Sequence, residues 1–173
     1  MRRFLFTTAG LMLCIMTLAL AGEEVAWFDM TNCEMCQNWA GDDKMMHEMK
    51  WEQHKISDGM MSVTTVSPKY MEKYVAAQKN AEALGQKLMS GYQAKLCGCC
   101  QAMGATMAHG ATMENVMLEN GSVMLLTASD EAVVKDIHKI VERNKVEMAK
   151  MMGQEGHGQP ADDDDDAHAG HDH

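Results

Sequence analysis

The chain has few aromatic residues, few prolines and none of the common enzyme motifs. Aromatic residues make up 5% of the 173 residues and proline occurs 2 times, whereas methionine occurs 20 times. Flexible thioethers must therefore fill much of the core that aromatic rings usually fill, and they are also soft metal ligands. The sequence contains no Gly-rich phosphate loop, Ser-His-Asp order, paired-carboxylate motif or His-Glu-x-x-His helix. Nothing indicates a nucleotide-dependent enzyme or a hydrolase, and we expect no enzyme.

Basic residues are also scarce. The chain has 15 Lys and Arg against 25 Asp and Glu, which gives a net charge of -10. Residues 153–173 contain many of the acids and no Lys or Arg, and the rest of the mature chain is mildly acidic without a basic stripe. The sequence therefore predicts no nucleic-acid partner.

The first residues indicate export. Arg2 and Arg3 precede an apolar run over residues 4–20, and Ala19-Leu20-Ala21 forms a small-residue cleavage site before Gly22. We expect a signal peptide over residues 1–21 and a periplasmic or secreted mature protein. The alternative is an uncleaved membrane anchor, for which the run is near the short limit.

The cysteines of the mature chain fall into two related groups. Cys33-Glu-Met-Cys36 matches Cys97-Gly-Cys99-Cys100 at an offset of 64 residues, with Gln37 over Gln101. After a two-residue slip, residues 56–67 match residues 118–129 at an offset of 62. We therefore predict two diverged repeats over residues 22–92 and 93–152, in which the cysteine pairs act together.

Each repeat carries the signals of a hairpin followed by a helix. Asp58-Gly59 and Asn120-Gly121 are typical central residues of two-residue turns with positive φ. They predict strands over 52–57 and 60–66, and over 114–119 and 122–128. Ser67 with Pro68, and Ser129 with Asp130, then begin helices that end near Gly91 and Gly153. One hairpin and one helix cannot close a core, so we predict one pseudo-symmetric α+β domain with an antiparallel sheet.

Residues 25–30 read as a strand that runs into Thr31-Asn-Cys-Glu-Met-Cys36. This segment resembles the heavy-metal-associated domains of copper chaperones, in which a Met-Thr-Cys-x-x-Cys loop joins the first strand to the first helix. The resemblance implies a ferredoxin-like βαββαβ fold, with Cys33 and Cys36 as ligands of Cu(I) or Zn(II).

The chemistry of the cysteine pairs independently favours a metal, because thiolates bind soft ions and a Cys-x-x-Cys loop can aim two sulfurs at one ion. The two pairs could form one closed zinc site of four thiolates or bind two Cu(I) ions. Cys99 is left as a fifth, assisting thiol. We expect a metal buffer or carrier, for copper first and zinc second, which passes the ion to a metal-transport protein.

Two other functions stay open. Exported proteins commonly use cysteines for disulfides, which would give a stapled interaction module without metal. A thiol-disulfide oxidoreductase is less favoured, because Asn32 precedes the first pair and Pro68 has the place of a helix-start proline. Covalent haem attachment is excluded, since Gln37 and Gln101 stand where histidine is required. Exposed hairpin edges could also pair two chains into a homodimer.

Methionine and histidine clusters provide further candidate ligands. Thioethers remain ligands where thiolates are oxidised, although Met along a helix is also common core filling. Solvent exposure explains His54 and His138 better.

Residues 153–173 form a low-complexity tail that should be disordered, either as a flexible chelator or as a solubilising acidic segment. The candidates are Met46, His47, Met49, Met107 and His109, and in the tail His168, His171 and His173.

Overall fold

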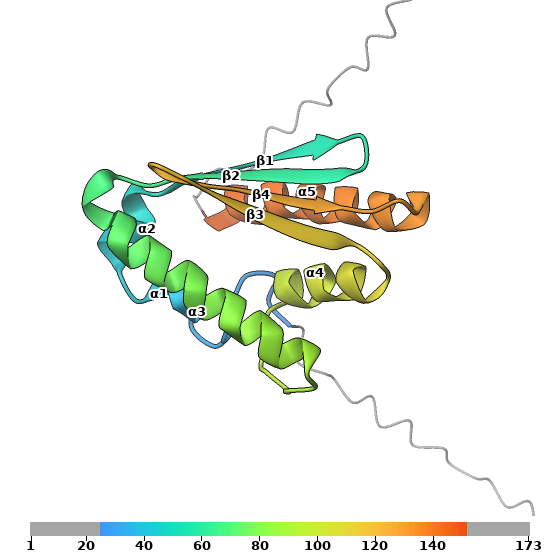
Figure 1. Ribbon diagram of the computed structural model, residues 1–173, viewed down its shortest axis with the longest axis horizontal. Coiled ribbons are helices and arrows are strands. Elements are labelled where there is room, and N and C mark those ends of the chain that lie inside the picture. The colour runs from blue at the N-terminus through green and yellow to red at the C-terminus, as the bar shows by residue number, and fades with distance from the viewer. Residues whose placement is uncertain (1–24, 152–173) are drawn as a thin grey trace, which may run out of the picture.

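The computed structural model describes residues 25–151. The predicted signal peptide and the tail, with His168, His171 and His173, lie outside the described residues. The elements in chain order are α1 (Gln37–Ala40), α2 (Asp43–Glu48), β1 (Lys50–Ile56), β2 (Gly59–Thr65), the 3-10 turn η1 (Pro68–Tyr70), α3 (Met71–Met89), α4 (Gly98–Ala108), β3 (Thr112–Leu118), β4 (Gly121–Thr127) and α5 (Glu131–Met151) (Figure 1). None of these helices is long and apolar enough to cross a membrane.

The four strands form one antiparallel sheet in the order β1-β2-β4-β3. The two strands of each hairpin pair with each other, β1 with β2 and β3 with β4. The two hairpins join where β2 pairs with β4, with Val63 opposite Val123 at the centre. The prediction of an α+β fold with an antiparallel sheet is confirmed. The hairpins from the two halves of the chain share one sheet, so neither half has a sheet of its own.

The hairpin turns differ from the prediction by one residue. Ile56 pairs with Gly59 and Leu118 pairs with Gly121, so the two-residue loops are Ser57-Asp58 and Glu119-Asn120. No non-glycine residue of the described chain has a positive φ. Gly59 and Gly121 have positive φ values of 159° and 148°, and β2 also lies very close to β4 at these positions. A Cβ atom on Gly59 would lie 2.0 Å from the backbone oxygen of Leu126, and one on Gly121 would lie 1.9 Å from that of Thr64.

All three long helices lie on one face of the sheet (Figure 1). Side chains alternate between the faces of a strand, and Met60, Leu126 and Ser122 fall on the same face in the observed register. Met60 and Leu126 form a buried cluster with Ile137 and Val141 of α5. Ser122 forms a hydrogen bond of 2.6 Å with the hydroxyl of Tyr74 on α3.

α3 and α5 each contact the hairpin of the other half of the chain. α5 from the second half packs on α4 and, within the sheet, mainly on β2 and β1 of the first half. α3 from the first half reaches the second hairpin, where Tyr74 bonds to Ser122 and the side chain of Gln78 accepts from Asn115 of β3 at 3.4 Å. Each half therefore completes the core of the other, and the two predicted repeat segments cannot fold as separate domains.

Two local predictions are wrong. Residues 25–30 form no strand, because the carbonyls of Ala26 and Trp27 accept from the first N–H groups of α4 instead of from a sheet. Ser67 makes no side-chain cap. α5 is capped by Asp130 and not by Ser129, since the carboxylate of Asp130 accepts from the N–H of Ala132 at 2.7 Å. A carboxylate at this position accepts the free amides of the first turn and also complements the helix dipole.

Candidate metal centre

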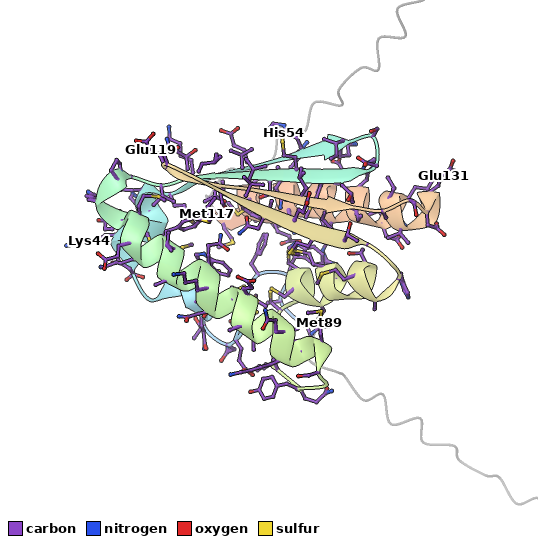
Figure 2. All side chains as sticks on the ribbon, viewed as in Figure 1. Lys44, His54, Met89, Met117, Glu119 and Glu131 are labelled. Atoms are coloured by element: carbon purple, nitrogen blue, oxygen red, sulfur yellow. The ribbon has the colours of Figure 1, made fainter. Side chains whose placement is uncertain are left out.

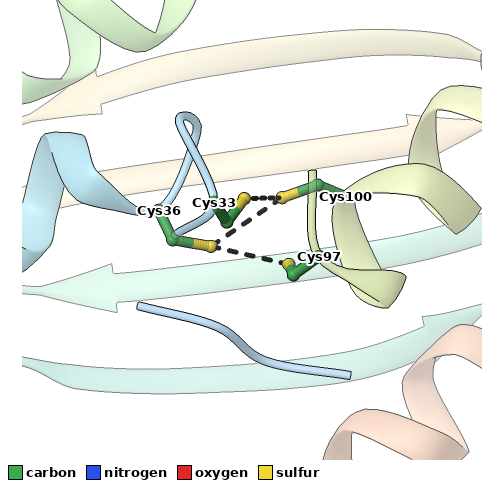
Figure 3. A group of neighbouring side chains, drawn as sticks. All are labelled: Cys33, Cys36, Cys97 and Cys100. Carbon is green, nitrogen blue, oxygen red and sulfur yellow. Dashed lines mark hydrogen bonds between the residues drawn. The ribbon is translucent and has the colours of Figure 1, made fainter. Parts of the chain in front are cut away.

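Four cysteines from the two halves of the chain meet at one point. The sulfur atoms of Cys33, Cys36, Cys97 and Cys100 all lie within 4.8 Å of one another. Sγ–Sγ distances are 3.7 Å for Cys33 to Cys100, 3.7 Å for Cys36 to Cys97 and 3.9 Å for Cys36 to Cys100. Figure 3 shows the four side chains pointing toward one another from the first loop and from the start of α4. The two cysteine pairs therefore form one cluster.

The sulfur atoms lie at distances compatible with a metal site, and no pair lies at the distance of a disulfide. A zinc ion with bonds of about 2.3 Å to four sulfurs places the sulfurs about 3.8 Å apart along the edges of the tetrahedron. Three of the six separations, at 3.7 to 3.9 Å, are close to this edge length, and the other three are no longer than 4.8 Å. A disulfide needs sulfurs about 2.05 Å apart, and the five cysteines among residues 25–151 are all free thiols.

Two equivalent glutamines hold the two cysteine loops in shape. The side-chain amide of Gln37 donates to the carbonyl of Thr31 at 2.5 Å, and that of Gln101 donates to the carbonyl of Leu96 at 2.7 Å. Each glutamine follows the second cysteine of its pair directly. Each bond therefore runs from the end of the cysteine loop back to its beginning, which limits the positions that the two sulfurs can take.

Backbone hydrogen bonds join the two loops to each other. The N–H groups of Gly98 and Cys99 donate to the carbonyls of Ala26 and Trp27 at 2.9 and 3.0 Å. On the other side, the N–H of Glu34 donates to the carbonyl of Lys95 at 2.9 Å. The carboxylate of Glu34 accepts from the N–H of Lys95 at 2.9 Å and from the Tyr92 hydroxyl at 3.0 Å. These contacts bring together segments about sixty residues apart and hold them before any ion is considered.

The thiols of the cluster ionise unequally. The pKa of Cys97 is lowered because the thiols of Cys100 and Cys36, and then the backbone N–H of Cys100, donate toward its sulfur. The pKa of Cys100 is raised by its hydrogen bonds with Cys36 and Cys97 and by burial. Cys97 also precedes the first turn of α4, where the helix dipole favours a thiolate. A cation is needed to hold four thiolates together against their mutual repulsion.

The site is closed toward the core and accessible on one side. Cys33 and Cys97 are only 1% and 2% exposed, whereas Cys36 and Cys100 are half-buried. Trp27 and Ile140 pack against the buried cysteines. Such a cluster can bind a soft ion with four thiolates, and an exchange partner could approach it from the side of Cys36 and Cys100.

Cys99 does not belong to the cluster. It is buried beside Asn144 of α5, whose side chain donates toward its sulfur, and burial raises the pKa of this thiol to about 12. The role predicted for Cys99 as an assisting ligand is therefore not supported by its position. α4 places Cys97 and Cys100 on the side of the first cysteine pair and turns Cys99 toward α5.

A buried polar network supports the site from the side of α5. Asn144 is 2% exposed, and its side-chain oxygen accepts from the indole N–H of Trp27 at 2.6 Å. Its amide donates to the side chain of Gln53 on β1 at 2.8 Å. Arg143 lies 4.1 Å from the centroid of the Trp27 ring. The loop that carries the first cysteine pair is thus anchored to α5 and β1.

We expect Asn144→Leu to lower the free energy of unfolding by about 2 to 3 kcal/mol, because the buried indole N–H and the Gln53 side chain lose their partner. Urea denaturation measures the change. Lys145→Leu is the matched control on the exposed side of the same helix, and its effect should stay within about 0.5 kcal/mol. Equal stability of the two variants would contradict a supporting role for Asn144.

The predicted histidine ligands of the described chain, His47 and His109, are not part of the cysteine cluster. Among residues 25–151, the one place where three or more His, Cys, Asp or Glu side chains could hold an ion together is the cysteine cluster. His47 is exposed on α2, and His109 is exposed directly after α4. Met49 packs against the buried cluster of Met45, Val66 and Tyr74 and therefore fills core. The remaining candidates are half-buried Met46 and exposed Met107.

The sequence misjudged one histidine and missed several supporting residues. His54 is exposed on β1, as expected, but His138 is half-buried and its Nε2 lies 3.0 Å from the carbonyl oxygens of both Ile56 and Gly59. His138 therefore holds the first hairpin against α5. No local pattern in the sequence indicates the roles of Trp27 and Asn144. The alignment of Gln37 with Gln101 was a signal from which the role of the two glutamines could have been predicted.

Comparison with known proteins adds no family to this description. No protein-family model, no curated protein and no solved structure matches the chain. The resemblance of the first cysteine loop to heavy-metal-associated domains stays a prediction, and the ferredoxin-like order that it implies is not confirmed.

Proposed function

We propose that the protein is an exported transition-metal-binding protein in which Cys33, Cys36, Cys97 and Cys100 hold a single ion. The observation that carries this proposal is the meeting of four sulfur atoms within 4.8 Å. Buried free thiols rarely converge in this way for packing alone, whereas four thiolates around one cation satisfy both the charge and the geometry. A hairpin and then a long helix follow each cysteine pair, which supports the further proposal that the two halves are diverged repeats.

Zn(II) is the ion that we propose first, and Cu(I) is the second candidate. Zinc in a protein takes four ligands at the corners of a tetrahedron, which agrees with the sulfur separations. Cu(I) is also selected by soft thiolates, and the resemblance of the first loop to copper-binding domains favours it. We therefore propose zinc before copper, which is the reverse of the order that the sequence suggested.

A buffer or carrier must release its ion to a recipient. Cys36 and Cys100, one from each pair, are half-buried, so a thiol of another protein could reach the ion next to them. Stepwise replacement of thiolates by incoming thiolates keeps the ion coordinated throughout the transfer. A metal-transport protein of the same compartment would be a suitable recipient.

The test counts bound metal and free thiols in one sample of the exported protein, isolated without reductant or chelator. Wild type should carry one more ion per chain than Cys97→Ser, because three thiolates at this site bind far more weakly than four. The tail contributes equally to both counts. Cys99→Ser is the matched control in the same helix turn, and it should keep the ion because its thiol does not reach the cluster.

Other results would contradict the proposal in distinct ways. Equal metal content in wild type and Cys97→Ser would remove the metal site. Two disulfides per chain without metal would favour the stapled interaction module. Reductant-dependent turnover of a disulfide substrate that is lost in Cys97→Ser would favour an oxidoreductase.

A further inference from the structure

The β3 strand is an unprotected edge of the sheet. All seven of its residues, Thr112–Leu118, are exposed, although four of them are large and apolar. Val116 is 51% exposed and Met117 is 42% exposed. The strand pairs with β4 on one side only, and no other strand among residues 25–151 bonds to its outer backbone groups. An edge of this kind is suited to pairing with another strand.

The opposite edge of the same sheet is protected. The β1 strand carries charged or ionisable side chains at four of its seven positions, namely Lys50, Glu52, His54 and Lys55. Such side chains are a usual means of preventing edge pairing. In β3 only Glu114 is charged, and the strand contains neither lysine nor proline. Figure 2 shows His54 projecting away from the helices at the β1 edge and Met117 between β3 and α3.

We propose that the β3 strand pairs in antiparallel fashion with the β3 strand of a second copy of this chain, about a two-fold axis at Asn115. This register is the one that pairs all seven residues of both strands. It places Met113 opposite Met117 of the second copy, and both residues belong to the helix face of the sheet in the observed register. The two methionine pairs cover apolar surface that is exposed in a single chain.

Charge supports the same register. Centring the pairs on Glu114 would set two carboxylates directly opposite each other, which is unfavourable. Centring them on Asn115 sets each Glu114 opposite Val116 of the second copy, on the open face of the sheet. The two four-stranded sheets then continue into each other, and only the two charged β1 edges stay exposed.

The register predicts opposite effects for two substitutions at one position. Val116→Glu places carboxylates opposite each other at two symmetric points, and we expect it to raise the dimer dissociation constant at least about tenfold. Val116→Lys places an ammonium group opposite each Glu114, and we expect dimerisation that is equal to wild type or tighter. Sedimentation velocity over a concentration series measures the dissociation constants. Since Val116 is about half exposed, both variants should fold, which circular dichroism verifies.

In the double variant Glu114→Lys with Val116→Glu, each new ammonium group lies opposite a new carboxylate of the second copy. This variant should therefore restore the dimerisation that Val116→Glu alone weakens. Amide hydrogen exchange in residues 112–118 of wild type should slow as the protein concentration rises. A wild-type protein that stays monomeric at millimolar concentration would overturn the proposal. A dimer that Val116→Glu and Val116→Lys weaken equally, or that neither changes, would also overturn it. None of these readouts depends on whether the cysteine cluster binds metal.

Discussion

Removal of the proposed metal ion is expected to lower the free energy of unfolding by at least about 4 kcal/mol. The ion joins two segments separated by about sixty residues, and a cross-link that closes a loop of this length stabilises a protein by about 4 kcal/mol through the unfolded chain. The thiolates left behind at the buried positions of Cys33 and Cys97 add to the loss. For a chain of this size the melting temperature should fall by on the order of 15 °C. Thermal unfolding with and without a strong chelator measures the effect.

Two variants separate the cluster from other metal sites. Chelation should destabilise Cys99→Ser as much as wild type, because Cys99 lies outside the cluster. Cys97→Ser should start from the lower stability and lose little more on chelation. Returning one equivalent of Zn(II) should restore the wild-type melting temperature. A chelator effect of equal size in Cys97→Ser and wild type would show that the stabilising ion is bound elsewhere.

Gly121→Ala is expected to destabilise the protein by about 4 kcal/mol or more, and Gly59→Ala by a similar amount. In each case the added methyl group would overlap a backbone oxygen of the neighbouring central strand, at 1.9 Å for Gly121 and 2.0 Å for Gly59. Because the opposing atom is backbone, relief requires the two hairpins to move apart along the β2–β4 pairing that joins them. Losses of this size are exceptional for single substitutions and follow from such named causes. Chemical denaturation of each variant measures the loss.

Helical glycines provide the matched control. Gly85 in α3 and Gly104 in α4 have no atom within 4 Å of an added Cβ. Alanine at either position should stabilise the protein by about 0.5 to 1 kcal/mol, since glycine is a poor helix former. Destabilisation of similar size at Gly85 and Gly121 would show that contact between the strands is not the cause.

Local signals in the sequence predicted most of the secondary structure. Turn residues, helix caps and the spacing of apolar residues act within a few positions. Both hairpins and the two helices α3 and α5 were therefore predicted to within a few residues. The failures came where a tertiary contact overrides a local preference. Residues 25–30 have the composition of a strand, but the carbonyls of Ala26 and Trp27 bond to the first residues of α4. The glycines of the turns are required by the facing hairpin more than by the turns themselves.

The sequence by itself determined the two cysteine pairs, the soft-metal chemistry of their thiols and the α+β class. Only the tertiary structure decided that the pairs converge on one centre, that Cys99 is turned away from it, and that α3 and α5 each cover the hairpin of the other half. The physical reason is distance along the chain. Contacts between segments about sixty residues apart depend on packing and on backbone bonds such as those of Glu34 with Lys95, and no local pattern encodes them.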